Sequence, residues 1–168
     1  VTSPSFVHLR LHTEYSITDG MVRIDDAVAK ASADGMAALA ITDLGNVFGM
    51  VKFYKTARGK GIKPVVGCDV WVTNEAERDK PFRLLLLAQS RAGYLRLSQL
   101  LSRAWLENQH RGRAEVSREW FDDVAGDGTN GGTEGLIALS GAAGGDVGLS
   151  LLQENTAQAD ARAAAWAK

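Results

Sequence analysis

The sequence predicts an α/β protein in which a parallel sheet carries its helices on the outside. Two observations lead to this prediction. Apolar residues switch repeatedly between the alternating spacing of strands and the wider spacing of helices, and the two kinds of segment follow each other in turn along the chain. Of the 168 residues, 45% are hydrophobic, which is enough for a substantial core. We therefore expect functional side chains at the carboxyl ends of the strands.

The chain is predicted to begin with a strand and a short helix. In FVHLRLH (residues 6–12) apolar side chains alternate with polar ones, so one face of this strand is polar. IDDAVAKASADG (residues 24–35) is typical of a helix. Asp25 and Asp26 lie near its positive N-terminal end, and Gly35 ends it.

A second strand, a helix and a third strand are expected next. AALAIT (residues 37–42) is an apolar strand, and Asn46 is a suitable cap for a helix in residues 47–61. IKPVVGCDVWV (residues 62–72) is the third strand. Its proline, Pro64, lacks an amide hydrogen and indicates a strand start or a bulge.

The remaining elements complete the alternation. RLLLLAQ (residues 83–89) is expected to be a strand buried on both faces, residues 93–106 an amphipathic helix and GLIALSG (residues 135–141) a fifth strand. Two more helices should follow. The glycine-rich stretch at residues 125–135 has no phosphate-loop spacing and no following lysine, so we interpret it as a plain connection.

Composition narrows the classes of function. Lys and Arg number 19 and Asp and Glu number 20, giving a formal charge of −1, so no domain-wide basic field favours nucleic acid. The one cysteine, Cys68, allows no internal disulfide, and we expect it to be a buried small side chain. No apolar run resembles a signal peptide or a membrane span, which favours a cytoplasmic location without membrane contact.

Polar residues gather where the predicted strands end. HLRLHTEYSITDG (residues 8–20) contains two histidines, His8 and His12, and an aspartate, Asp19, which are types that bind metals. Arg10 lies between the histidines. The stretches TDLGN, GCD and SGAAGGD follow or end other strands. These residues are compatible both with a working metal site and with the remains of one.

Several blocks carry a resemblance to a known family. FVHLRLHTEYSITDG, ALAITDLGNVFGMVKFYKTARGKGIKPVVGCDVWV, LLLLAQSRAGYLRLSQLLSRAW and GLIALSGAAGGDVG resemble, in this order, the N-terminal polymerase-and-histidinol-phosphatase (PHP) domains of bacterial DNA polymerase III alpha subunits. The resemblance implies an irregular, TIM-like βα barrel. Residues 1–168 would then be an N-terminal portion with about five strands, truncated before the last ones.

The resemblance also assigns metal-site positions. The family pattern has metal ligands at the positions of Arg10, His12, Asp19, Leu44, Asp69, Arg83 and Ala142. Only His12, Asp19 and Asp69 can still serve as metal ligands, and Asp69 is one methylene shorter than the glutamate of the family pattern. Two further ligands would lie beyond the end of this sequence.

The replaced residues are poor ligands. Leucine and alanine offer no lone pair, and arginine stays protonated. Intact relatives bind Zn or Mn and hydrolyse phosphoesters with metal-activated water, so we expect a vestigial site here, with no catalytic residue and no bound cofactor. The guanidinium groups of Arg10 and Arg83 would replace the metals by pairing with Asp19 and Asp69. Replacing Arg10 with methionine is then expected to cost about 3–5 kcal/mol.

The resemblance implies part of a replicative DNA-directed DNA polymerase. Polymerisation would use Mg²⁺ in a separate palm domain, and DNA would be bound by the full-length polymerase. This domain would stabilise the other polymerase domains and bind the proofreading 3′–5′ exonuclease subunit. The alternatives are a metal-dependent phosphoesterase or PHP exonuclease with a residual metal site, and an error-prone paralogue of the polymerase.

Two other groups of residues allow more than one interpretation. His110, Arg111 and Arg113 form either a basic contact patch or, as we expect, a solvated loop. The tryptophans could stack on bases, but their strand or helix context favours core or interface positions. They are Trp71, Trp105, Trp120 and Trp166.

Overall fold

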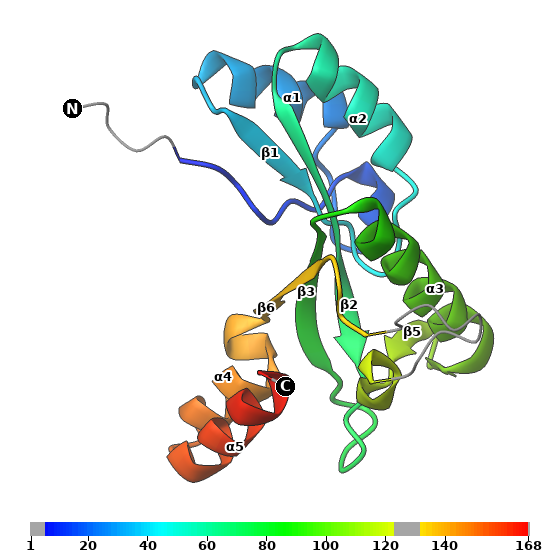
Figure 1. The fold of residues 1–168 in the computed structure, drawn as a ribbon, viewed down its shortest axis with the longest axis vertical. Helices are drawn as coiled ribbons and strands as arrows, with labels where there is room; N and C mark the ends of the chain where they lie inside the picture. The colour runs from blue at the N-terminus through cyan, green and yellow to red at the C-terminus, as the bar shows by residue number, and fades with distance from the viewer. Residues whose placement is uncertain (1–5, 123–131, 168) are drawn as a thin grey trace.

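The structure is a computed structural model, and it describes residues 6–122 and 132–167. Its framework is a six-stranded sheet in the order β4-β5-β2-β3-β6, with β1 also paired to β2 (Figure 1). The strands are β1 (Ala38–Ile41), β2 (Lys63–Val72), β3 (Phe82–Ala88), β4 (Gln109–His110), β5 (Arg113–Val116) and β6 (Leu136–Ser140). The predicted α/β class is confirmed.

Helices pack around this sheet. They are α1 (Ile24–Ala33), α2 (Met50–Gly59), α3 (Arg91–Glu107), α4 (Asp146–Leu152) and α5 (Thr156–Trp166), with 3-10 turns η1 (Glu14–Ser16), η2 (Arg118–Phe121) and η3 (Ala142–Gly144). Figure 1 shows α1 and α2 at the top beside β1, and α4 and α5 at the opposite end. Within residues 6–122 and 132–167, every helix is too short or too polar to cross a membrane.

The prediction of a parallel sheet is wrong. β1 and β5 run parallel to β2, but β3 is antiparallel to β2, and β6 is antiparallel to β3. Only residues 73–81 connect β2 to β3, and they contain no helix. A parallel neighbour needs a crossover of about a dozen residues or more, so this short connection forces the chain to turn back.

The predicted first strand is also wrong. Residues 6–12 run beside β1 without joining the sheet as a strand. Two backbone hydrogen bonds hold them there, from Ala40 N to His8 O (3.0 Å) and from Thr42 N to Leu11 O (2.9 Å). The amide of Leu11 donates to the side-chain hydroxyl of Thr42 (2.8 Å), whereas in a paired strand it would donate to a backbone carbonyl of the neighbouring strand. This side-chain acceptor interrupts the regular backbone hydrogen bonding between the two segments.

A β-hairpin replaces the solvated loop that we expected around His110. β4 and β5 pair antiparallel, and the turn residues Arg111 and Gly112 both have positive φ, at 50° and 76°. Such turns favour Asn-Gly or Asp-Gly. Because arginine is an unusual residue at the first of these positions, the sequence contains no recognisable hairpin signal.

Two further predictions concern helix α2 and the glycine-rich connection. Asn46 does not cap α2, since the N-cap is Gly49, and Asn46 Oδ1 accepts instead from Phe48 N at 3.0 Å. Pro64 stands at the start of β2, as predicted. Of residues 125–135, only 132–135 are within the described residues.

The two faces of the sheet differ in chemistry. Alternate residues of β2 point to opposite sides, and Cys68 and Val70 enter a core cluster with residues of α3. Cys68 is fully buried, as predicted. Asp69 and Trp71 therefore lie on the other face, where Trp71 pairs in register with Arg83 of β3. A second core cluster joins α1, α2 and β1.

Candidate functional site

The centre of the site is the carboxylate of Asp69, whose side chain is 2% exposed. Arg83 donates to both oxygens, from Nε to Oδ1 at 3.0 Å and from Nη2 to Oδ2 at 2.7 Å. Arg10 approaches Oδ2 with Nε at 2.8 Å and Nη2 at 2.6 Å. His12 Nε2 lies 3.0 Å from the same oxygen. We call Arg10, His12, Asp69 and Arg83 the Asp69 cluster.

Backbone pairing brings these residues together. The antiparallel register of β2 and β3 places Arg83 opposite Trp71, two residues from Asp69 and on the same face. The Arg83 guanidinium lies over the Trp71 ring, 4.3 Å from its centroid, which fixes its orientation. Arg10 and His12 reach the cluster from the extended segment beside β1.

Charge in the cluster changes the pKa values. Burial would raise the pKa of Asp69, but hydrogen bonds from His12 and Arg83 and the charges of both arginines outweigh it and hold the pKa well below its usual range. The hydrogen bond to Asp69 raises the pKa of His12 against the opposing effect of burial, with help from Asp19. The cluster therefore favours an ionised aspartate beside a protonated histidine.

Asp19 has a different partner from the one expected. His12 Nδ1 lies 2.9 Å from Asp19 Oδ2, and Asp19 is 41% exposed. Both arginines pair with Asp69 instead. His8 does not join this group either, because its ring is exposed and packs edge-on against Phe6 with centroids 4.6 Å apart.

Leu44 and Ala142 border the cluster without a side-chain donor atom. Leu44 forms a parallel bridge with Asp69, and its amide donates to Ser16 Oγ at 2.7 Å. Ala142 is an exposed residue of η3 with φ of 46°. This turn packs closely on β3, since a Cβ added to Gly141 would lie 2.3 Å from the carbonyl oxygen of Arg83.

Sequence reasoning missed two buried acids. Asp43 is 1% exposed, and its carboxylate accepts from Thr13 N (2.5 Å) and Thr13 Oγ1 (2.8 Å). Glu115 of β5 is fully buried and pairs with Arg78 at 3.2 Å. The sequence could have indicated Asp43, because it is an acidic residue directly after an apolar strand. It gave no such indication for Glu115, which lies in the β4–β5 hairpin that the sequence did not predict.

No cluster of three or more His, Cys, Asp or Glu side chains within residues 6–122 and 132–167 is arranged to hold a metal ion. Both oxygens of Asp69 accept hydrogen bonds from guanidinium groups, and Oδ2 also faces the imidazole of His12. The positive charge of these groups repels a cation. What the cluster can do chemically is hold three segments together through one carboxylate. These segments are residues 6–12, β2 and β3.

The fold and cluster define an α/β domain with the Asp69 cluster on one face of a mixed sheet. The family profile described as "PHP domain" matches residues 8–168, so the chain belongs to the PHP domain family. It is 49% identical over 170 residues to a DNA polymerase III subunit alpha from Neisseria meningitidis, covering 99% of this chain and 14% of that protein.

Other relatives carry the same name. The identity is 44% to the DNA polymerase III subunit alpha of Pseudomonas aeruginosa and 42% to that of Escherichia coli, over 96% and 95% of this chain. The chain spans 13% of the length of each. Among solved structures, an amidohydrolase from Chromobacterium violaceum aligns with a TM-score of 0.47 and 22% identity, over 58% of this chain and 32% of that one.

Proposed function

We propose that this chain is part of the catalytic alpha subunit of a replicative DNA-directed DNA polymerase, where it serves as a PHP scaffold without hydrolytic activity. The observation that carries the scaffold role is the pairing of buried Asp69 with Arg83 and Arg10. Identities of 42–49% to proteins named DNA polymerase III subunit alpha support the polymerase role.

The donor set does not fit a Zn or Mn centre. A divalent ion needs neutral imidazoles or free carboxylate oxygens as ligands. Arg10 and Arg83 occupy two ligand positions with positive charge, and they already use both oxygens of Asp69. Leu44 and Ala142 supply no donor atom. The positions Arg10, His12, Asp19, Leu44, Asp69, Arg83 and Ala142 are thus the remains of a metal site in this proposal.

The proposal assigns polymerisation to other domains. Those domains would hold Mg²⁺ in the palm and contact DNA, and this domain would stabilise them and receive the proofreading 3′–5′ exonuclease subunit. The chain would be the N-terminal portion of the PHP domain and would act in the cytoplasm. If this domain has no hydrolytic metal site, hydrolytic proofreading in this proposal falls to that separate subunit.

Metal content and hydrolysis test the proposal directly. The full polypeptide, purified without chelator, is analysed for bound Zn and Mn and assayed for phosphoesterase and exonuclease turnover. We expect less than about 0.1 equivalent of Zn or Mn and no turnover. A variant with Arg10→His, Leu44→His and Arg83→His is the matched control, because it restores donors at three ligand positions.

The rival function is a metal-dependent phosphoesterase or PHP exonuclease with a residual site. About one equivalent of Zn or Mn or more, with turnover that is lost in His12→Ala or Asp19→Ala, would establish that function and refute the scaffold. A polypeptide that binds neither Zn nor Mn and also shows no primer extension with deoxynucleoside triphosphates and Mg²⁺ would refute the polymerase role instead.

A further inference from the structure

Four basic side chains lie close together in the chain where α2 ends and β2 begins. Lys55 and Arg58 are on α2, Lys60 follows this helix and Lys63 begins β2, and all four are exposed. None of their side chains has a carboxylate or a hydrogen-bond partner among the residues that the structure describes. α2 itself contains no acidic residue. We call these four residues the basic patch.

The other lysines in the described part of the chain each have a carboxylate partner. The pairs are Lys30–Asp34 at 2.6 Å, Lys52–Glu14 at 3.1 Å and Lys80–Glu77 at 2.8 Å. The basic patch is therefore the place where lysine charge is left unbalanced. Like charges that gather without counter-charges repel one another, and an anion bound there would relieve this repulsion.

The dipole of α2 accounts for part of this charge. Arg58 lies in the last turn of α2 and Lys60 is its C-cap residue, where positive charge stabilises the negative end of a helix. The same explanation does not extend to Lys63, which is in a strand. Nor does it extend to Arg91, the first residue of α3, because α3 has no acidic residue in its first turn to balance a cation at its positive end.

A groove with two tyrosines lies between α2 and α3. Its volume is about 410 Å³, and Tyr54, Tyr94 and Arg91 line it without any carboxylate. Tyr54 is 48% exposed. Since Tyr54 and Arg58 are four residues apart on α2, they are neighbours on one side of this helix. The side chain of Arg91 is exposed and, like the basic patch, has no partner among the described residues. We call this the tyrosine groove.

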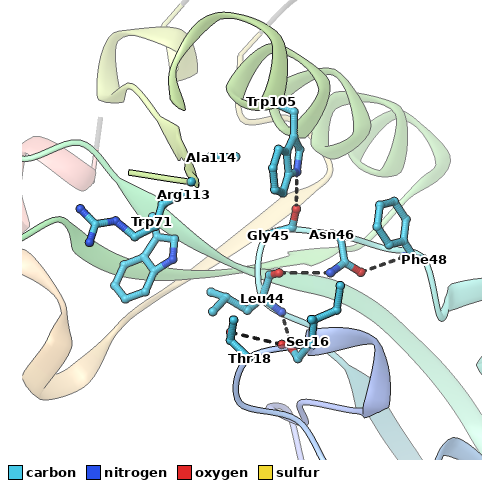
Figure 2. Close-up of a pocket in the computed structure, with 12 residues that line it drawn as sticks. Ser16, Thr18, Leu44, Gly45, Asn46, Phe48, Trp71, Trp105, Arg113 and Ala114 are labelled. Carbon is cyan, nitrogen blue, oxygen red and sulfur yellow. Dashed lines mark hydrogen bonds between the residues drawn. The ribbon is translucent and has the colours of Figure 1, made fainter. Parts of the chain in front are cut away.

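Another hollow of similar size lacks this combination. Figure 2 shows Trp71 and Trp105 on different sides of it, and its volume is about 360 Å³. Arg113 is the one charged residue that lines it among the described residues, and it pairs with buried Glu115 at 3.4 Å. Nothing in that hollow selects an anion, whereas the cations beside the tyrosine groove are unpaired.

Unpaired cations beside exposed aromatic rings are the combination that binds single-stranded nucleic acid. Lys and Arg side chains attract phosphates whatever the base sequence, and tyrosine rings stack on unpaired bases. An acidic protein segment would use the cations but would leave the two rings without a role. The formal charge of −1 for the whole chain does not oppose this binding, because salt screens charges that are more than about 8 Å away.

We propose that the basic patch and the tyrosine groove together bind a segment of single-stranded nucleic acid. Its phosphates would lie along Lys55, Arg58 and Arg91, and a base would stack on Tyr54. Such contacts carry no sequence preference, because they reach phosphates and the faces of bases instead of base edges. This site goes beyond the proposed function, which assigns the DNA contacts to other domains.

Photo-cross-linking of the full polypeptide tests this site. The probe is an oligodeoxythymidylate that contains 5-bromodeoxyuridine, and mass spectrometry of the cross-linked peptides separates this surface from the DNA contacts of other domains. We expect a cross-link at Tyr54 or Tyr94. Lys55→Glu combined with Arg58→Glu should lower its yield at least about fivefold, because two phosphate contacts are lost. The yield should also fall as the salt concentration rises.

Lys30→Glu combined with Lys80→Glu is the matched control. It changes the net charge by the same amount, and both lysines are well exposed, at 75% and 74%, but lie outside the basic patch and the tyrosine groove. The cross-link yield should stay within about twofold of that of the unaltered protein. Circular dichroism of each variant checks the fold.

An equal fall of the yield in the control, or cross-links confined to other domains, would overturn the nucleic-acid site. The proposed function would then stand, because primer extension and Zn or Mn content test it separately.

Another part of the same polypeptide could also cover the basic patch. Amide hydrogen exchange of residues 50–63 distinguishes this case, because nucleic acid protects these amides only after it is added. Strong protection in the free polypeptide that the oligonucleotide leaves unchanged would overturn the nucleic-acid site. Equal protection by a duplex would overturn the single-stranded part of it, since paired bases cannot stack on Tyr54.

Discussion

Replacing Arg83 with methionine should cost much more stability than replacing Arg10. Arg83 is 15% exposed and donates twice to Asp69, which is 2% exposed. Removing one partner of a buried ion pair typically costs about 3–5 kcal/mol. Since Arg10 and His12 remain, we expect the lower end, about 3 kcal/mol.

The sequence alone predicted a cost of about 3–5 kcal/mol for Arg10→Met, but the Arg10 side chain is 59% exposed. Because water screens its pairing with Asp69, the expected loss of stability for Arg10→Met is about 1 kcal/mol. The larger loss of stability is therefore expected for Arg83→Met.

Amide hydrogen exchange of β2 and β3 in the full polypeptide measures these costs as free energies of local opening. Asp69→Asn in the Arg83→Met background is the matched variant. It should recover part of the loss, because it removes a buried charge that has lost the two hydrogen bonds from Arg83. Equal costs for Arg83→Met and Arg10→Met, or a cost below about 1 kcal/mol for Arg83→Met, would refute the reasoning.

Three further predictions follow from individual contacts. In an NMR titration the pKa of His12 in the folded protein should lie above its ordinary value of 6.5. The contribution of the protonated His12 to stability should be complete below about pH 6.5, should be lost as pH rises through the folded-state pKa, and should be absent in His12→Gln. Thr13→Val should cost about 1–3 kcal/mol in local exchange, because buried Asp43 loses a hydrogen bond of 2.8 Å; an unchanged value would contradict this. Gly67→Ala should cost about 1–3 kcal/mol, since its Cβ would lie 2.3 Å from Leu86 O, and a neutral thermal shift would refute the steric argument.

Local sequence patterns predicted most of the helices and the central strands. The helix at residues 24–35 was confirmed because both of its ends carry local signals, two acids at the start and Gly35 with φ of 71° at the end. β2 and β3 were visible as apolar runs. The segment 6–12 has the same alternation as a strand, yet pattern alone does not show that a neighbour offers a hydroxyl instead of a carbonyl.

Strand direction was the main error in the fold. Alternation shows which residues share a face, but it contains no information on whether the next strand runs parallel or antiparallel. The length of residues 73–81 was the relevant signal, because it is too short for a helical crossover. The β4–β5 hairpin was missed for a different reason, since Arg111 adopts a positive φ that its residue type does not suggest.

What the sequence by itself determined is the chemistry available at each position. The side chains of Leu44 and Ala142 cannot bind a metal in any fold, and arginine keeps its charge in any surroundings. Only the tertiary structure decided that Arg10 and Arg83, which are 59 and 14 residues from Asp69, converge on that one carboxylate while Asp19 pairs with His12. Side-chain chemistry is a local property of the residue, whereas the partner of a charge depends on strand register and burial, which arise from contacts between distant parts of the chain.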